Sequence, residues 1–375
     1  MRLAVLARLP LVLSCATEGG GSSGASNVPS AGDGPFRPLV AAEMSPTAIA
    51  PFVLSSPTAL YREPSVVGTS SDPTSAQVWM YAVAVSGGSD VIVRTRADDA
   101  RSFYGDVGDN ANASLSSEHA AATVLRADQP WEGADLSGPS ALRTGGQVLL
   151  YYAAAGGIGL ATSTDGLSFT KSAGPVLAPD AASSSAWETT APHAPTVALF
   201  PDGSWHMLYG AGDSIGEATS ADGQTWTRVD SNPVLSPSPA VDASTLPAGA
   251  QPPFDEGRVD HPVLAPRTDV AGRLQVRVLY TGYGPTTGAA EPSSAIGLAA
   301  RYGTAGPLSR QATAVYTVSL HEAAPAFFEY SGGSLLYVQE DNGSLDPMPP
   351  YTAIAAAYAP IDGSLPAALG YPDSP

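Results

Sequence analysis

The chain reads Ile-Gly-Leu-Ala-Thr-Ser-Thr-Asp-Gly-Leu-Ser-Phe-Thr-Lys from Ile158 to Lys171, and Ile-Gly-Glu-Ala-Thr-Ser-Ala-Asp-Gly-Gln-Thr-Trp-Thr-Arg from Ile215 to Arg228. Both copies are followed by Pro-Val-Leu, and both are preceded by an aromatic-rich run and a short segment that begins with proline. The Asp-Gly pair in each copy is typical of a tight turn between antiparallel strands. One copy with its flanks therefore predicts a unit of four short strands.

Looser copies of this unit cover most of the remaining chain. Segments that begin with proline and lead into two further strand-like runs start at Pro64, Pro139, Pro195, Pro262 and Pro325. Repeated four-stranded units are typical of propeller blades. We therefore expect an all-β fold, a five-bladed β-propeller of four-stranded antiparallel blades.

The repeats also set the expected domain limits. One domain is predicted at residues 45–360, followed by a C-terminal tail at 361–375. The fifth unit lacks a clear fourth strand, whereas Pro51–Ser55, which reads Pro-Phe-Val-Leu-Ser, resembles a fourth strand without a unit of its own. We expect this segment to complete the last blade, because closing the ring removes exposed sheet edges.

Composition excludes several classes of protein. With 39 glycines and 35 prolines in 375 residues, a helical bundle is excluded, because both residues disrupt helix interiors. The net charge of −18 argues against a nucleic-acid partner, whose phosphates need a basic surface. The same charge disfavours anionic substrates, so we expect a neutral one.

The N-terminus predicts an exported lipoprotein. Residues 1–14 form a short basic and apolar signal peptide, and Val12-Leu13-Ser14-Cys15 resembles the bacterial lipobox, whose cysteine carries the lipid. Residues 15–44 are then the lipidated cysteine and a flexible Gly/Ser-rich tether. The expected location is the bacterial cell envelope, at the outer membrane or cell surface, with the lipid as the sole membrane contact. The alternative is an ordinary signal followed by an incidental cysteine.

The repeated motif resembles the blade signature of the five-bladed propeller glycoside hydrolases. That group includes family 43 arabinosidases and xylosidases, the levansucrase and invertase relatives, and family 130 phosphorylases. A second resemblance, to the sialidase Asp-box, is one residue short at Ser220–Trp226. In the propeller enzymes, catalytic carboxylates stand just before the proline of the innermost strands, where one acid and one base or nucleophile face the sugar.

The resemblance implies specific candidates. Glu63 takes the position of base or nucleophile, and Asp260 or Glu322 that of the acid, although the usual order of three acids along the chain is not reproduced. Substrate contacts are implied for residues beside these prolines: Arg62, His193, His261 and His321.

A second pattern places an aromatic residue beside a carboxylate eight residues before three of the prolines. Its members are Trp131-Glu132, Trp187-Glu188 and Phe254-Asp255. Glu188 and Asp255 are candidates for contact with sugar hydroxyls. The alternative is that each aromatic side chain fills the gap between blades.

Two functions remain open. The first is a glycoside hydrolase of the family 43 type acting on a neutral oligo- or polysaccharide. The second is a non-catalytic glycan-binding or scaffold propeller that has lost the catalytic acids. Either is expected to be a monomer without a cofactor or catalytic metal, although a structural ion in the central channel is possible.

Overall fold

The structure is a computed structural model of residues 1–375. It describes residues 37–38, 61–68, 78–97, 103–105, 122–180, 187–247, 252–268, 272–285, 292–316, 322–330, 333–341 and 352–360. Within these ranges the chain forms short antiparallel sheets, with one 3-10 turn at Ala243–Thr245. No helix in this part of the chain is long and apolar enough to cross a membrane.

The sheets are antiparallel and follow the sequence order. Their first strands are β2 (Tyr61–Gly68), β7 (Ser137–Thr144), β11 (His193–Leu199), β15 (Arg258–Thr268) and β19 (Glu322–Tyr330). Their second strands are β3 (Val78–Ser86), β8 (Gln147–Ala154), β12 (Trp205–Ala211), β16 (Leu274–Tyr283) and β20 (Gly333–Asp341). Their third strands are β4 (Ser89–Ala97), β9 (Gly157–Ser163), β13 (Ser214–Ser220), β17 (Ser294–Tyr302) and β21 (Thr352–Pro360). Each proline-led segment of the sequence thus lies within a first strand, which begins two to four residues before the proline.

The outer strands are shorter than the sequence predicts. They are β10 (Thr170–Lys171), β14 (Thr227–Arg228) and β18 (Ser309–Arg310), while β5 (Phe103–Gly105) and β6 (Ala122–Leu125) both pair with β4. The Pro-Val-Leu segments add one isolated bridge each, as Leu177 does to Ile158 and Leu235 does to Ile215. The fourth strand is therefore the threonine and basic residue that end the repeated motif, as in Thr170–Lys171. The Pro-Val-Leu segment lies beside the start of the third strand.

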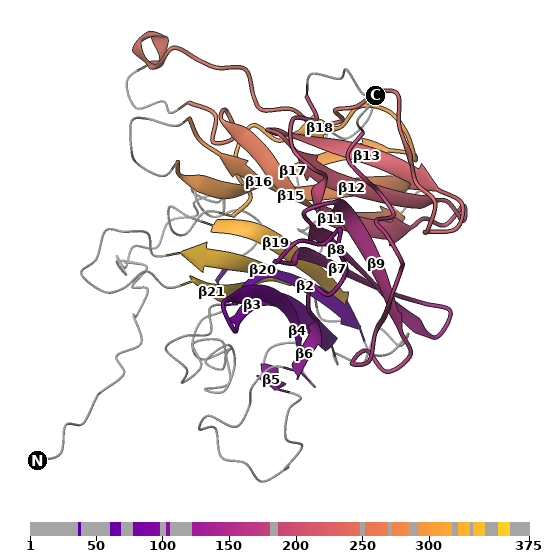
Figure 1. The fold of residues 1–375 in the computed structure, drawn as a ribbon. Helices are drawn as coiled ribbons and strands as arrows, with labels where there is room; N and C mark the ends of the chain where they lie inside the picture. Colours follow the sequence, from indigo (N-terminus) through magenta and orange to yellow (C-terminus); the bar gives the residue numbers. More distant parts are fainter. Residues whose placement is uncertain are drawn as a thin grey trace, which may run out of the picture.

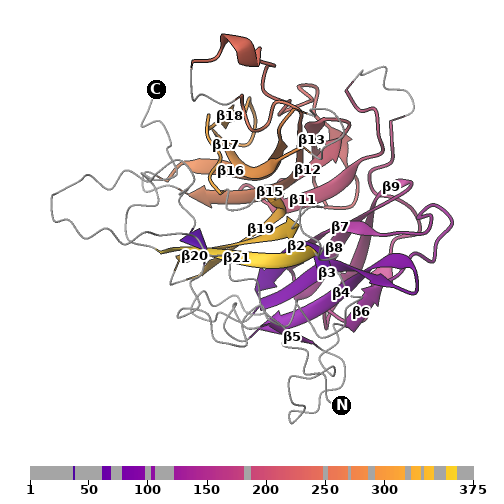
Figure 2. The same cartoon turned by 90° about the vertical axis from the view of Figure 1, so that its left-hand side faces the viewer.

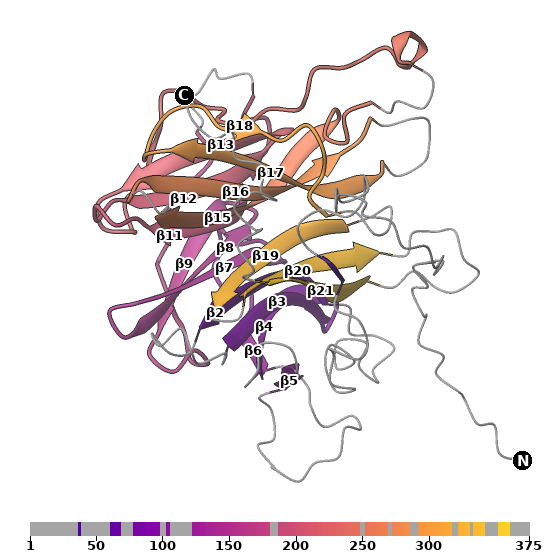
Figure 3. The ribbon, with the colours of Figure 1, turned by 180° about the vertical axis from the view of Figure 1, so that it is seen from behind.

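The sheets are arranged around a common centre as the blades of an all-β propeller (Figures 1 and 2). The first strands lie innermost and contact one another in chain order, and β19 also contacts β2. Seen from behind, β19, β20 and β21 again lie beside β2 and β3 (Figure 3). The last sheet takes its outer strand from the N-terminal side, because β1 (Arg37–Pro38) pairs with β21. The predicted closing segment Pro51–Ser55 lies outside the described residues.

The repeated motif lies between neighbouring sheets. Tyr81 donates its hydroxyl hydrogen to the Gly166 carbonyl (2.9 Å), and Tyr151 does the same to Gly223 (2.6 Å). Within each turn the aspartate carboxylate accepts two backbone N–H groups, which lower the pKa of Asp222 to about 2. The Asp-Gly turn of one sheet is thus held by a tyrosine of the sheet before it.

Candidate functional site

The residue before each inner-strand proline has a left-handed backbone. Its φ is 50° at Glu63, 53° at Gly138, 43° at Ala194, 47° at His261 and 46° at Ala324. The strand register shifts at the same place in all five strands. This conformation favours glycine and is unusual before proline. Three of the positions carry glycine or alanine, whereas Glu63 and His261 carry side chains able to do chemistry.

These residues line one end of the central channel. The channel encloses a cavity of about 270 Å³ between the five inner strands. Glu63 and His261 lie at its leading end, and the lining farther along the strands includes Val66, Leu142 and Phe327. We call the leading end, with Arg62, Glu63, His193, Arg258, Asp260 and His261, the channel mouth. The channel is therefore polar at the mouth and largely apolar beyond it.

Glu63 is held at the mouth from two sides. The Gly138 N–H donates to its Oε2 (2.5 Å), and its Oε1 lies 3.9 Å from His261 Nε2. Burial would raise the pKa of Glu63, but the interactions with His261 and the Gly138 amide outweigh burial and lower it. Glu63 is therefore ionised at neutral pH.

Asp260 lies deeper and is 3% exposed. The backbone N–H of His261 donates to its Oδ1 (2.7 Å), and its carboxylate lies 3.2 Å from His193 Nε2 and 3.6 Å from His261 Nδ1. Burial opposes ionisation, yet the charges of His261 and His193 and that of Arg258 hold the pKa of Asp260 well below its usual range. A carboxylate in this state is a poor proton donor.

The surroundings of His193 decide its charge. Its Nδ1 lies 3.0 Å from the Ala191 carbonyl oxygen, and its Nε2 lies 3.2 Å from Asp260. Because a carbonyl and an ionised carboxylate only accept hydrogen bonds, both ring nitrogens must donate, and the ring is an imidazolium. Burial alone would lower the pKa of His193, but Asp260 outweighs it and raises the pKa. For His261, burial is likewise outweighed by Asp260 and Glu63, and its pKa is raised.

The other predicted site residues are distributed as follows. Arg62 forms an ion pair with Asp90 (2.5 Å) at the edge of the mouth. Glu322 is the first residue of β19 and pairs with Glu340 of β20. His321 lies outside the described residues.

Glu188 and Asp255 are not brought to the mouth. Arg228 of β14 donates from Nε to Glu188 (2.9 Å), and Arg310 of β18 donates to Asp255 (2.6 Å). Both carboxylates are at most 3% exposed. Each therefore ties a loop to the outer strand of its own sheet.

The aromatic residues beside these acids pack on tyrosines of the second strands. Trp131 stacks on Tyr152 and Phe254 stacks on Tyr280. The same tyrosines donate their hydroxyl hydrogens to the acids, from Tyr152 to Glu132 (2.6 Å) and from Tyr280 to Asp255 (2.9 Å). In both units the acid is buried and the aromatic ring is partly buried on a tyrosine of the same sheet.

Sequence reasoning missed Arg258 of the mouth and two residues that contact mouth residues, Tyr283 and Gly210. Arg258 stacks over the Tyr283 ring, with its Cζ 4.0 Å from the ring centroid. Burial and the charge of Asp260 raise the pKa of Tyr283 to about 12. Gly210 lies beneath Asp260 and His193, where an added Cβ would stand 2.2 Å from Asp260 Oδ1. Only the alternation of β15, which places Arg258 two residues before Asp260, could have indicated Arg258.

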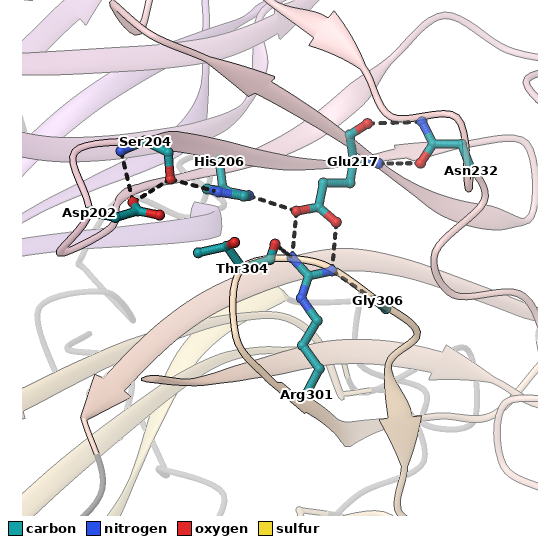
Figure 4. A network of polar contacts seen from close by, with 8 residues as sticks. All are labelled: Asp202, Ser204, His206, Glu217, Asn232, Arg301, Thr304 and Gly306. Atoms are coloured by element: carbon teal, nitrogen blue, oxygen red, sulfur yellow. Dashed lines mark hydrogen bonds and ion pairs between the residues drawn. The ribbon is translucent and has the colours of Figure 1, made fainter. Parts of the chain in front are cut away.

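A separate polar chain crosses between β12, β13 and β17 (Figure 4). Ser204 Oγ lies 3.0 Å from His206 Nε2, and His206 Nδ1 lies 2.8 Å from Glu217. The order resembles a Ser-His-carboxylate triad. However, Arg301 binds both oxygens of Glu217 (2.6 and 2.7 Å), and Ser204 donates to Asp202 (2.6 Å). These contacts occupy the groups that a nucleophilic serine would need, so the polar network joins two sheets.

Comparisons with known proteins support the fold. No protein-family model matches the sequence, and no curated protein matches it. Among solved structures, a BT0996 RGII complex superposes with a TM-score of 0.57 at 15% identity, covering 88% of this protein and 92% of that one. Zg3597 is a family 117 glycoside hydrolase of the marine bacterium Zobellia galactanivorans. It superposes with a TM-score of 0.54 at 15% identity, covering 86% of this protein and 89% of that one.

A third structure is CoXyl43, a GH43 β-xylosidase/α-arabinofuranosidase from a compost metagenome in complex with xylotriose. It gives a TM-score of 0.50 at 14% identity, covering 86% of this protein and 93% of that one. At such identities the likeness concerns the fold alone. The protein has the propeller architecture of these glycoside hydrolases.

Proposed function

We propose that this chain is a carbohydrate-active propeller, a monomeric glycoside hydrolase of the family 43 type whose site is the channel mouth. The observation that carries the proposal is the placement of Glu63 and His261 at left-handed positions before proline. Strained backbone of this kind clusters at functional sites. The other three equivalent positions carry glycine or alanine.

We assign the base to Glu63. Glu63 Oε1 lies 3.9 Å from His261 Nε2. This distance is too long for a direct hydrogen bond, but one oxygen atom beside the pair can form a hydrogen bond with each side chain. A water molecule at this point would give a proton to Glu63 as its oxygen attacks the sugar. Asp260, buried and strongly acidic, positions the two histidines instead of acting as the acid.

The acid is assigned to Glu322. It stands at the start of β19, the inner strand beside β2, so its strand end faces the same mouth as Glu63. The proton from Glu322 goes to the glycosidic oxygen as the bond to the sugar breaks. Exchange with solvent then restores both carboxyl groups.

Two variants test these roles in a screen of aryl glycosides and oligosaccharides. Glu63→Gln should lower hydrolysis of every substrate by at least about 100-fold while saccharide affinity stays within a few fold. Glu322→Gln should slow natural oligosaccharides far more than activated aryl glycosides, whose leaving groups need no proton. Asp230→Asn, which removes an exposed carboxylate, is the control.

Retention of the full rate in Glu63→Gln would refute the assignment of the base. The rival function is a non-catalytic glycan-binding or scaffold propeller. It would be supported if the wild-type protein bound saccharides without hydrolysing any of them and Glu63→Gln bound equally well.

We also propose that the five sheets form a closed five-bladed ring. The cyclic contacts of the inner strands support this arrangement, since β19 meets β2. The pairing of β1 with β21 supports it further, because it joins the N-terminal side of the chain to the last sheet.

Export to the cell envelope is proposed from the sequence alone. Val12-Leu13-Ser14-Cys15 supports lipidation at Cys15 and attachment to the outer membrane or cell surface. A Cys15→Ala protein should be released from membranes or remain uncleaved. Membrane partition equal to that of the wild type would contradict lipidation.

A further inference from the structure

The channel mouth holds more cationic groups than its carboxylates balance. Asp260 alone faces three of them: His193 at 3.2 Å, His261 at 3.6 Å and Arg258 at 4.0 Å. Glu63 contributes a second negative charge, 3.9 Å from His261. Among these described contacts, with both imidazoles protonated, three positive charges stand against two negative ones, and Glu322, protonated as the proposed acid, adds no charge. Arg62 is excluded from this comparison because Asp90 neutralises it.

Arg258 differs from the other arginines with described ion pairs. The side chains of Arg62, Arg228, Arg301 and Arg310 are 4–31% exposed, and each has a carboxylate oxygen within 2.9 Å. The side chain of Arg258 is 40% exposed, and the nearest carboxylate that the described residues offer it is 4.0 Å away. Among these five arginines, Arg258 is therefore the one whose positive charge is least neutralised by a carboxylate.

An aromatic ring orients the Arg258 side chain. Its guanidinium lies over the Tyr283 ring, which faces it across the β15–β16 pair. An arginine held against an aromatic ring loses little freedom on binding, and its planar fork matches a carboxylate or a sulfate with two hydrogen bonds. Alternation along β15 places Arg258 on the same side as Asp260 and two residues nearer the strand's start.

We propose that the channel mouth recognises a saccharide bearing an acidic group, a carboxylate or a sulfate ester, with Arg258 as its anchor. This inference rests on the proposed function and names its substrate class. It departs from the neutral substrate expected from the net charge of −18. That expectation concerns long-range repulsion over the whole surface, whereas binding at the mouth depends on charges within a few ångströms. Long-range repulsion still favours a short oligosaccharide over a highly charged polymer.

The test compares saccharides with and without a free acidic group. Calorimetry with the full chain would use oligogalacturonides and the same oligomers with every carboxyl methyl-esterified, and in a second arm sulfated galactan oligosaccharides and their desulfated forms. At least one acidic form should bind about tenfold tighter or more than its neutral partner, as expected for a charge-assisted pair. The arm that shows the preference identifies the acidic group.

Arg258→Gln should abolish that preference and leave the affinity for the neutral form within about twofold. Arg273→Gln is the matched control. Arg273 also stacks on a tyrosine, 4.4 Å from the Tyr302 centroid, but at the opposite end of the same sheet. It should keep the full preference.

Equal binding of acidic and neutral forms in both arms would overturn the inference while leaving the proposed function standing. A preference that survives in Arg258→Gln would also overturn it. If none of these saccharides and none of the screened glycosides bound or reacted, the proposed function would fail as well. Thermal unfolding of each variant at the wild-type temperature confirms that a loss of preference is local.

Discussion

Gly210 determines where the mouth's central carboxylate can lie. It pairs with His193 across β11 and β12, and an added Cβ would stand 2.2 Å from Asp260 Oδ1 and 2.8 Å from His193 Nε2. The contact between Asp260 and His193 therefore requires a residue without a side chain beneath it. A backbone position outside the mouth thus controls two charges within it.

We expect Gly210→Ala to push Asp260 away from His193. Overpacking of this kind costs about 1–3 kcal/mol of unfolding free energy, and the pKa of His193 should fall toward its ordinary value. Because the folded pKa of His193 is raised, its contribution to stability is present below about pH 6.5 and is lost as pH rises through the folded pKa. The variant should therefore be destabilised more in the acidic range than above that pKa.

Histidine NMR titration and denaturant unfolding at two pH values would check this. Gly174→Ala is the control, because an added Cβ there meets nothing within 4 Å. An unchanged His193 titration in Gly210→Ala would show that Asp260 does not set the charge of that ring.

Part of the site could be predicted from the sequence. Glu63, His193, Asp260 and His261 stand one or two residues before inner-strand prolines, and their mutual contacts lie at one mouth. Arg258 carries no such marker, because its role depends on a ring across the sheet. The pairs of an aromatic residue and an acid were also predicted from a repeated pattern, but the structure does not bring them to the mouth. A pattern repeated in blade after blade indicates packing, and Asp255 proved to be bound by Arg310.

At the scale of elements, the left-handed residue before proline is a feature of every inner strand. Its N–H is satisfied from different sources. Thr281 Oγ1 accepts the N–H of Ala324 (2.9 Å), Gln339 Oε1 accepts that of Glu63 (3.3 Å), and Glu63 itself accepts that of Gly138 (2.5 Å). The sequence predicted the strands from proline but could not predict this bend, because its φ depends on contacts between sheets.

We expect glycine to be tolerated where alanine now occupies this bend. In Ala324→Gly, relief of the left-handed strain offsets the lost methyl group and the added chain entropy, so the unfolding free energy should stay within about 1 kcal/mol of the wild type. Ala161→Gly, a buried alanine of β9, should cost about 1–2 kcal/mol, because no strain is relieved there.

The reverse change should be costly. In Gly138→Ala the new Cβ would stand 2.8 Å from Ala194 Cα, which is backbone and cannot move aside. A loss of about 2 kcal/mol or more is expected. Urea unfolding of the three variants gives the comparison, and equal stability of Gly138→Ala and the wild type would show that the inner strands shift freely.

At the scale of the whole molecule, the order of strands was predictable but the pairing of β1 with β21 was not. The four strand-like runs in each repeated unit predict the order of the strands along the chain. A segment on the N-terminal side was expected to complete the last sheet, and Arg37–Pro38 pairs there, with Arg37 opposite Tyr358. A strand of two residues has no hydrophobic alternation to mark it in the sequence. Pro51–Ser55 lies outside the described residues, so its part in completing the last sheet stays a prediction.

This pairing makes closure testable by two truncations of the mature protein. Deletion through residue 36 keeps β1, and deletion through residue 40 removes it together with its bonds to β21. Loss of the pair should uncover the edge of the last sheet and lower the unfolding free energy by about 1–2 kcal/mol. For a chain of this size that corresponds to a fall of a few degrees in Tm. The shorter deletion should leave Tm unchanged.

Equal Tm values for the two truncations would show that β1 contributes nothing to closure. A large fall already in the shorter deletion would place the closing contact before residue 37.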